Sequence, residues 1–455
     1  MIRTLFLLAS MAMATGLSAQ KIHWLPQSDT QNYQGVAISP DGKFITGYNA
    51  YIPLSEEEYY GTNCGFIWSI SKNKGYDVEA NPYNGSSMLD ISDEGKAVGY
   101  ALESSGDPQN PLFHAAMLDV ADVKIANIDN DNTVAYGISS DGKVIVGYLN
   151  DGTSKACVWR DGERILLPLP SPEEAGESAV VSSEARYVSG DGSVVLGKIV
   201  CESPIEGSDR TYKAELVTAW RLQSDGAYKY DLVYKQIYDQ KSDKSKPFIK
   251  AQPMGISDDG NWISLQTRGT YQNEEGLWVL DLVDRMTRMN LSTGQYTTAI
   301  LDGSNGLEYT YPCRPGGIAN DGTMVGAYGL DDSRKAIIWD TDKTLPEFVA
   351  DKFGFVEIND LFINQAVDIT ADASRIVGFG KYETGLSRTF WIETGKGTPN
   401  GIDSDIADSA EQHVVGVYTT DGVFVSKSGT EGLPHGLYIL KTTDGKTVKT
   451  KKVMK

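Results

Sequence analysis

The stretch from Gly35 to Tyr48 reads GVAISPDGKFITGY, and it is the first of about seven related segments in a chain of 455 residues. Each segment joins a short apolar strand to a polar turn and then to a second strand rich in β-forming residues. The copies lie roughly 45 to 70 residues apart, near the spacing typical of solenoids, propellers and arrays. The other copies are MLDISDEGKAVGY from Met88, YGISSDGKVIVGY from Tyr136, YVSGDGSVVLGK from Tyr187, MGISDDGNWISLQ from Met254, GGIANDGTMVGAY from Gly316 and VDITADASRIVGF from Val367.

The turn of most copies carries an Asp-Gly step, which predicts a β-hairpin because glycine tolerates a positive φ at the tip. The last copy has Asp372-Ala373 instead, so we expect its turn to be strained or of another type. The aspartates are interpreted as turn residues rather than calcium ligands, since an EF-hand-like loop needs several spaced oxygens and a terminal Glu. The Asp-Gly steps begin at Asp41, Asp141, Asp191, Asp259 and Asp321.

A third strand, ending in Trp or an equivalent residue, follows most hairpins. Six of the eight tryptophans fall in this segment, and we predict that they share one structural position. Packing of the ring between adjacent sheets is the favoured interpretation, and a ladder that stacks a ligand is the alternative. A fourth strand is visible in several copies, for example Ile165 to Leu169 and Tyr228 to Tyr234. The six residues are Trp68, Trp159, Trp220, Trp278, Trp339 and Trp391.

Four strands in each of about seven repeats predict an all-β fold, a seven-bladed β-propeller over residues 21–400 followed by a small C-terminal β-module. The seventh repeat has no convincing fourth strand after Trp391. The segment Ile22 to Leu25 resembles the fourth-strand segment Ile165 to Pro168. We therefore predict that Ile22 to Leu25 pairs into the last blade and leaves no open edge.

The repeat resembles the extracellular HAF-type repeats. The segments Ile138 to Gly142, Ile145 to Gly147 and Cys157 to Trp159 carry this resemblance most fully. It extends over about residues 30 to 395, and the fourth and fifth copies depart from it through long inserts. The resemblance implies a fold and almost nothing about activity.

The N-terminal residues 1–20 have the pattern of a signal peptide. Arg3 precedes the apolar runs Leu5 to Ala9 and Met11 to Ala14, and small residues follow up to Gln20. No cysteine lies near the expected cleavage site, and no later stretch reaches the roughly 18 apolar residues of a membrane helix. The pattern predicts an exported protein without a transmembrane segment.

The last residues form a second unit in the sequence. After an Asp/Ser/Ala-rich linker at 401–412, residues 413–455 resemble the C-terminal sorting domain of the bacterial type IX secretion system. The resemblance rests on Val417-Tyr418, Asp421-Gly422, Gly436 to Ile439 and a lysine-rich end at Lys455. The upstream Pro-Asn element is absent, and a plain β-module is the alternative. The resemblance implies contact with the secretion machinery and a secreted or outer-surface location in a diderm bacterium.

Charge and cysteine usage restrict the partners. The formal net charge is −20, which repels phosphate backbones and disfavours nucleic acid. The four cysteines lack any Cys-x-x-Cys pair, so a zinc site is not expected. They are compatible with one disulfide or with buried thiols. The four are Cys64, Cys157, Cys201 and Cys313.

No group of residues indicates chemistry. His114 is the only histidine in the middle of the predicted propeller, and no nucleophile-elbow motif accompanies it. The acidic runs at 56–60 and 129–132 are interpreted as solvated loops, although a glycosidase-like acid pair stays open. Gly316-Gly317 precedes a predicted strand rather than a helix, so it is not a phosphate cradle.

We therefore assign no catalytic, cofactor-binding or metal residue. The sequence favours a secreted or cell-surface, non-enzymatic binding or scaffold protein with an unidentified glycan or protein ligand. The alternative is a propeller hydrolase or lyase that acts on glycan or peptide. An enzyme should cluster ionisable residues at one mouth of the central channel.

Overall fold

The structure is a computed structural model, and it is almost entirely β-sheet, as predicted. The helices in its described part are α1 (Pro172–Ala175), α2 (Val349–Phe353) and a 3-10 turn, η1 (Ser304–Gly306). The chain divides into two compact units, residues 1–394 and 395–455. The residues described are 22–26, 31–51, 63–77, 85–103, 112–204, 207, 209–235, 248–272, 278–299, 301–308, 310–330, 333–355, 361–382, 387–396, 413–419, 424–426, 437–443 and 448–454.

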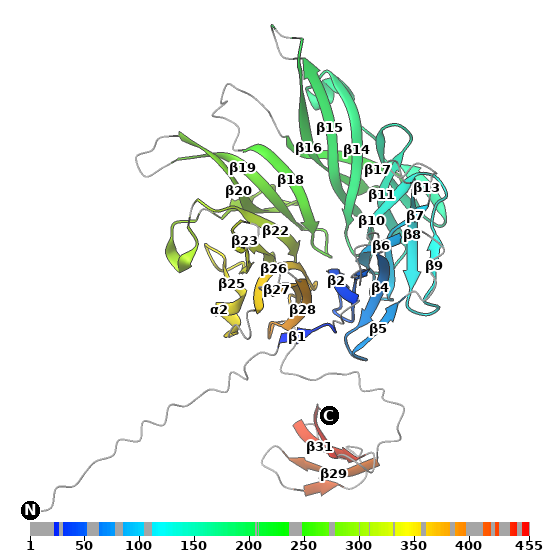
Figure 1. The fold of residues 1–455 in the computed structure, drawn as a ribbon, viewed down its shortest axis with the longest axis vertical. Helices are drawn as coiled ribbons and strands as arrows, with labels where there is room; N and C mark the ends of the chain where they lie inside the picture. Colours follow the sequence, from blue (N-terminus) through cyan, green and yellow to red (C-terminus); the bar gives the residue numbers. More distant parts are fainter. Residues whose placement is uncertain are drawn as a thin grey trace, which may run out of the picture. The chain divides into compact units, whose positions relative to one another are not determined.

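The first unit holds seven antiparallel sheets of four strands each (Figure 1). The first blade contains β2 (Gln31–Ile38), β3 (Phe44–Tyr51), β4 (Cys64–Ser69) and β5 (Lys74–Asp77). The second contains β6 (Gly85–Ile91), β7 (Lys96–Glu103), β8 (Leu112–Asp119) and β9 (Ile125–Asn127). The third contains β10 (Thr133–Ile138), β11 (Val144–Asn150), β12 (Ser154–Arg160) and β13 (Glu163–Leu166).

The remaining blades follow the same order from the inner strand outward. The fourth has β14 (Ala179–Val188), β15 (Val194–Pro204), β16 (Thr211–Leu222) and β17 (Tyr228–Lys235). The fifth has β18 (Phe248–Ile256), β19 (Trp262–Gln272), β20 (Trp278–Asn290) and β21 (Tyr296–Thr298). The sixth has β22 (Cys313–Ile318), β23 (Met324–Tyr328), β24 (Lys335–Trp339) and β25 (Glu347–Phe348). The seventh has β26 (Leu361–Ile369), β27 (Arg375–Tyr382), β28 (Ser387–Glu393) and, from the other end of the chain, β1 (Ile22–Trp24). The predicted seven-bladed propeller is confirmed.

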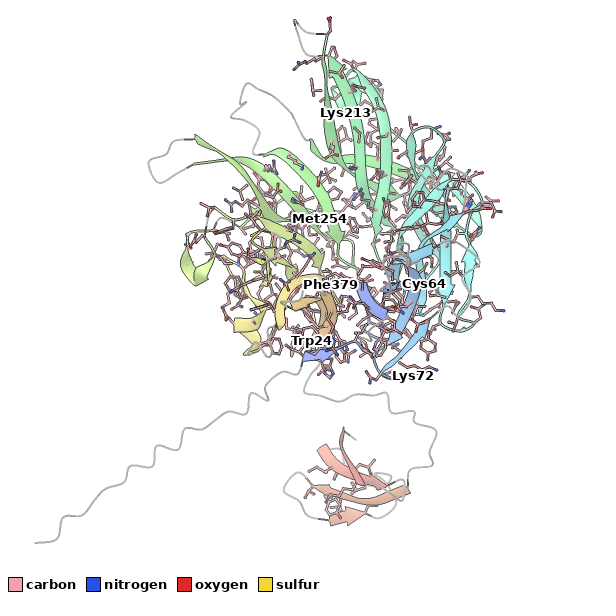
Figure 2. The ribbon with its side chains drawn as sticks, in the orientation of Figure 1. Trp24, Cys64, Lys72, Lys213, Met254 and Phe379 are labelled. Atoms are coloured by element: carbon pink, nitrogen blue, oxygen red, sulfur yellow. The ribbon has the colours of Figure 1, made fainter. Side chains whose placement is uncertain are left out.

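Strand β1 closes the ring, and this prediction is also confirmed. It pairs antiparallel with β28, with His23 opposite Trp391 and Trp24 opposite Phe390. The His23 ring stacks on Trp391 with centroids 3.9 Å apart, and Trp24 meets Phe390 edge-on. Figure 2 labels Trp24 at this strand. The N–H of Leu25 then donates to the Thr389 carbonyl at 3.0 Å. The last sheet is thus completed by a strand that precedes the first repeat in the chain.

The hairpin tips follow the predicted turn chemistry. In the first blade the Asp41 carboxylate accepts hydrogen bonds from the Ser39 hydroxyl (2.8 Å) and the Lys43 N–H (3.0 Å). Gly42 has a φ of 76°. Ala373 adopts a φ of 59° at the equivalent tip, a conformation that costs an L-residue roughly 1–2 kcal/mol. The turn of the seventh blade therefore has the same geometry and is strained. Of the two outcomes expected from the sequence, a strained turn or another turn type, the first is confirmed.

The tryptophan prediction is only partly correct. Four rings share one register position on the third strand, and all four are buried between blades. At these positions packing, rather than a ligand ladder, explains the repeat. The four are Trp68, Trp159, Trp220 and Trp339, which pair with Ile45, Ile145, Val195 and Met324.

The other two tryptophans lie elsewhere. Trp391 pairs with Val377, one position away from the shared one. Trp278 begins β20, and Met289 near the end of that 13-residue strand takes the shared position. The error arose because the strand is much longer than the repeat pattern indicates.

The fourth and fifth blades have longer strands than the other blades. Strands β15, β16, β19 and β20 have 11 to 13 residues each. Their hairpins extend beyond the neighbouring blades in Figure 1. These extensions lie at the ends of the blades opposite the Asp-Gly turns. The propeller face opposite those turns therefore projects further at the fourth and fifth blades than elsewhere.

The second unit is a separate four-stranded antiparallel sheet in the order β30 (Phe424–Ser426), β29 (His413–Thr419), β31 (Leu437–Thr443) and β32 (Val448–Met454). Val417 and Tyr438 are buried in it, and the Lys441 ammonium lies 4.8 Å from the Tyr418 ring centroid. A terminal β-module is confirmed. Within the described residues, no helix is long and apolar enough to cross a membrane. The predicted signal peptide and linker lie outside the described residues.

Candidate functional site: the central channel

The hairpin turns form a ring of hydrogen bonds at one end of the channel, here called the turn ring. At five of the seven blade junctions a backbone N–H donates directly to the carbonyl of the equivalent turn residue in the next blade, at 2.7 to 3.0 Å. Because such bonds hold adjacent turns in contact, this is a narrow end of the channel. The turn ring consists of Pro40, Asp93, Ser140, Gly190, Asp258, Asn320 and Ala371.

The other two junctions use side chains. Pro40 has no N–H, and the N–H of the next residue, Asp41, donates to the Asp93 carboxylate at 2.8 Å. The Asp259 N–H likewise donates to the Asn320 side chain at 2.9 Å. Burial, with the charges of Asp41 and Asp258 nearby, raises the pKa of Asp93 to about 6. The ring is therefore complete despite the proline.

A β-bulge interrupts every inner strand at the same place. The bulged residue has no direct partner on the second strand, and a bulge of this kind turns its side chain away from the sheet. In β22 both Gly316 and Gly317 lack a direct partner. One bulged residue from each of the seven inner strands lines a channel cavity of about 380 Å³. This bulge ring consists of Val36, Leu89, Tyr136, Arg186, Met254, Gly316 and Val367. Figure 2 shows Met254 at the inner strand of its blade.

The bulge explains the glycine that ends the repeat segment Ile145 to Gly147. A Cβ on Gly147 would lie 1.9 Å from the Val134 carbonyl oxygen, and a Cβ on Gly47 would lie 1.9 Å from that of Gln34. No side chain fits at these distances. The fifth blade has Leu265 at this position instead.

The bulge ring is polar on one side only. The Arg186 guanidinium donates to the Glu184 carboxylate through Nε (3.0 Å) and Nη2 (2.7 Å). It also lies 5.2 Å from the centroid of the Tyr136 ring, whose other neighbour is Tyr148 with centroids 5.7 Å apart. Burial lowers the pKa of Arg186, but Glu184 outweighs this and keeps it above its ordinary value. The rest of the bulge ring is mainly aliphatic, as at Val36.

Two aspartates join neighbouring blades just below the bulge ring. Asp368 accepts the Ile38 N–H of the first blade at 3.0 Å, and Asp90 accepts the Ile138 N–H of the third blade at 2.9 Å. The second oxygen of each carboxylate accepts the N–H of the following residue in its own strand. Burial raises the pKa of Asp90 to about 7 and that of Asp368 to about 6.

A third carboxylate lies at the narrow end. Asp258 belongs to the turn ring and accepts a hydrogen bond from the Ser140 hydroxyl. A Cβ on Gly190 would lie 1.9 Å from the Asp258 Oδ1. Glycine at this turn therefore makes room for the carboxylate between two blades.

The residues singled out from the sequence lie away from this cavity. His114 is buried in β8, where Nε2 lies 2.7 Å from the Glu103 carboxylate and Nδ1 lies 3.1 Å from the Asp131 carbonyl. Gly316-Gly317 is the exception, because it lies within β22 and lines the channel; it does not precede the strand as predicted. The acidic run at 56–60 lies outside the described residues. The four cysteines are thiols rather than disulfides.

The acidic run at 129–132 is structural. Asp129 accepts the Trp159 indole N–H at 2.9 Å and an Arg164 N–H at 2.6 Å. Arg164 also contacts Asp131 at 2.8 Å. Burial acts to raise the pKa of Asp129, but these bonds outweigh it and keep that pKa below its ordinary range. The run ties the second blade to the third.

Sequence reasoning missed the channel residues. The only signal was variation: the two residues before the Ile-Ser step, or before the Val-Ser, Ile-Ala or Ile-Thr step that replaces it, vary among the copies, while their surroundings repeat. In the part of the chain that the structure describes, no three His, Cys, Asp or Glu side chains come together as a metal site.

No family model and no curated protein matches the chain. Several solved structures are distantly similar. A TolB from Agrobacterium tumefaciens has 15% identity and a TM-score of 0.33, covering 59% of this chain and 79% of that one. A puromycin-hydrolyzing peptidase from Mycobacterium tuberculosis has 11% identity and a TM-score of 0.43, covering 93% of this chain and 58% of its own. The acylaminoacyl peptidase of Pyrococcus horikoshii has 13% identity and a TM-score of 0.48, covering 93% and 59%. The chain thus spans under three fifths of both peptidases, and similarity at this level carries no activity over.

Proposed function

We propose that this protein is an exported, non-enzymatic binding protein whose ligand enters the channel from the face opposite the turn ring. The observation that supports this most is the bulge ring, which places seven residues of six types at one cavity. A repeat supplies the scaffold, and the residues that break the repeat supply specificity. The extended hairpins of the fourth and fifth blades flank the same entrance.

The bonding of the channel acids supports binding over catalysis. Asp90 and Asp368 each accept two backbone N–H groups, and Asp258 is engaged by a hydroxyl. A general acid or base must instead reach a reacting proton in the substrate. Among the described residues that line the cavity there is no histidine, cysteine or lysine.

The test uses the mature chain, residues 21–455, on glycan and protein arrays. Met254→Trp fills the cavity with a larger side chain and should abolish binding. The control is Leu166→Trp on the outer strand β13, where the leucine is exposed; its binding should match that of the unaltered protein. If Met254→Trp, folded by circular dichroism, binds as well as the control, the channel is not the binding site.

A hydrolase or lyase acting on glycan or peptide is the second candidate. The observation that favours it is the raised pKa of two channel carboxylates, Asp90 and Asp368, since such shifts cluster at functional sites. Turnover of array substrates that is lost in Asp90→Asn or Asp368→Asn would establish this reading and overturn the first. Binding without turnover would exclude it.

Export and sorting are part of the proposal. The leader at 1–20 would direct export, and the resemblance of residues 413–455 to a type IX sorting domain suggests transfer to the cell surface. The resemblance of the repeats to HAF-type repeats is consistent with an extracellular role. Deleting residues 436–455 should leave the protein in the periplasm, as measured by cell fractionation and surface proteolysis. Unchanged surface display would refute the sorting role.

A further inference from the structure

The cavity has an apolar collar above an acidic floor. Four of the seven bulge-ring residues, Val36, Leu89, Met254 and Val367, are aliphatic, and a fifth, Gly316, has no side chain. Along each inner strand the next residues lead toward the turn ring. Asp90 and Asp368 lie one residue below the collar, and Asp258 lies in the turn ring itself. A ligand that enters past the collar therefore meets three carboxylates.

The floor has no balancing positive charge among the described residues that line the cavity. Arg186 is the only lining cation, and the Glu184 carboxylate already neutralises it with two hydrogen bonds. Asp90, Asp258 and Asp368 have neutral partners only, which are backbone N–H groups and a hydroxyl. Enclosed charges of one sign concentrate the field and attract the opposite charge.

From this arrangement, and resting on the proposed binding function, we propose that the cavity takes a lysine or arginine side chain of a peptide ligand. The aliphatic stem of such a side chain would lie against Val36, Leu89, Met254 and Val367. Its ammonium or guanidinium head would lie among Asp90, Asp258 and Asp368. Long basic side chains combine an apolar stem with a charged head in this way.

Other ligand classes fit less well. Anionic groups would be repelled by the three carboxylates. A single metal ion requires ligands that converge on one point, and no three acidic side chains do so in the described residues. A neutral sugar would leave the carboxylates without a counter-charge, which is costly in an enclosed site. The volume of about 380 Å³ falls within the usual range for small-ligand pockets.

The proposal links binding to pH. Asp90 and Asp368 hold protons more tightly than an exposed aspartate because burial raises their pKa to about 7 and about 6. Tyr187 and Arg186 of β14, Tyr136 of β10 and Asp258 face the same space. A cation binds the ionised carboxylates, so affinity should rise with pH between 5 and 8. The basic head stays protonated throughout that range.

The experiment is calorimetric titration of the mature chain with the blocked tripeptides acetyl-Gly-Lys-Gly-amide and acetyl-Gly-norleucine-Gly-amide. Norleucine keeps the aliphatic stem and lacks the charge. The lysine peptide should bind at least about tenfold more tightly at pH 8. Asp368→Asn retains an acceptor oxygen and loses the charge, and it should reduce lysine binding by about tenfold or more. Asp231→Asn, on the outer strand β17, is the matched control and should leave it unchanged.

Each outcome decides the question. Equal binding of both peptides, or binding of neither, overturns the proposal. If Asp368→Asn alters the melting temperature, Met254→Trp provides a second test, because it fills the collar without removing charge. Unchanged binding of the lysine peptide by Met254→Trp also refutes the proposal. If the arrays yield a ligand that lysine peptides do not compete for, the general binding function stands and only this inference fails. If they yield turnover instead, the proposed function itself fails.

Discussion

Leu25 is the residue through which the closing strand anchors the ring, and its truncation offers a direct test of closure. It is 1% exposed and packs in one cluster with Ile38, Phe66 and Trp391, which come from the first and last blades. Leu25→Ala removes three buried carbons at this seam. A buried Leu→Ala change costs about 3 kcal/mol. The propeller should lose that amount, because both partner blades are held by the ring and cannot collapse into the space.

The expected change in melting temperature follows from the size of the propeller. Unfolding entropy is about 2.1 cal/mol/K per residue, so roughly 370 residues give about 0.8 kcal/mol/K. A loss of about 3 kcal/mol therefore lowers the melting temperature by about 4 °C. The assay is differential scanning calorimetry of both proteins at one scan rate.

Leu166→Ala is the matched control, since it makes the same chemical change on the outer strand β13, where the leucine is 51% exposed. It should shift the melting temperature by under about 1 °C, as surface substitutions usually cost less than about 0.5 kcal/mol. If Leu25→Ala melts within a degree of Leu166→Ala, the β1 seam does not contribute to closure and the reasoning is wrong.

Four further substitutions, and one control, test the blade junctions and turns. Arg288 is buried, lies 4.2 Å from the Trp339 ring centroid and donates to the carbonyls of Asp340 and Thr341 in the next blade. Arg288→Met should lower the free energy of unfolding in urea by about 2–4 kcal/mol. The control is Arg160→Met, because Arg160 donates one exposed hydrogen bond to a backbone carbonyl; this change should cost less than about 1 kcal/mol. Asp90 has a folded-state pKa of about 7, above its unfolded value of about 3.9. The stability of the wild type relative to Asp90→Asn is therefore greatest below about pH 4 and falls as pH rises through about 7, by on the order of 4 kcal/mol in total. If the wild type and Asp90→Asn differ in stability by the same amount at pH 5 and at pH 8, this prediction is wrong. Gly142→Ala should cost about 1 kcal/mol because Gly142 has a φ of 70°. Ala373→Gly should change stability by less than half of that, since the relieved strain offsets the lost methyl group and the added chain entropy; a larger change in thermal unfolding would count against it.

The features that the sequence predicted correctly depend on local chemistry. The Asp-Gly turns, the alternation of the strands and the return of the same pattern all lie within a few residues of one another. The closing strand was predictable as well, because the last repeat lacked a fourth strand and Ile22 to Leu25 matched one. Each of these features can be read from one segment or from a comparison of two segments.

The channel residues could not be predicted in the same way. A β-bulge at Arg186 or Tyr136 depends on how two strands align, and the residue there looks like any other strand position. Arg288 meets carbonyls about fifty residues later in the chain, and nothing near it in the sequence indicates a partner. The repeat pattern misplaces Trp278, because in this blade Met289 and not a tryptophan occupies the shared register position.

The position just below the bulge ring explains how a symmetric repeat makes an asymmetric cavity. The seven blades place Ala37, Asp90, Gly137, Tyr187, Gly255, Gly317 and Asp368 there. A carboxylate at this position needs space in the adjoining blade, and Gly317, whose Cβ would lie 2.2 Å from the Asp368 Oδ1, provides it. Asp90 lies beside Gly137, but there a Cβ would be 3.5 Å from its Oδ2, which is an ordinary contact distance. Aspartate and glycine are therefore coupled at the junction of Asp368 and Gly317, so a change of Gly317 to a larger residue should displace Asp368 and disturb the acidic floor without touching the collar. The charge of the cavity is thus set by residues that differ between repeats, and at Asp368 also by a glycine of the neighbouring repeat, while the scaffold is set by what all seven repeats share.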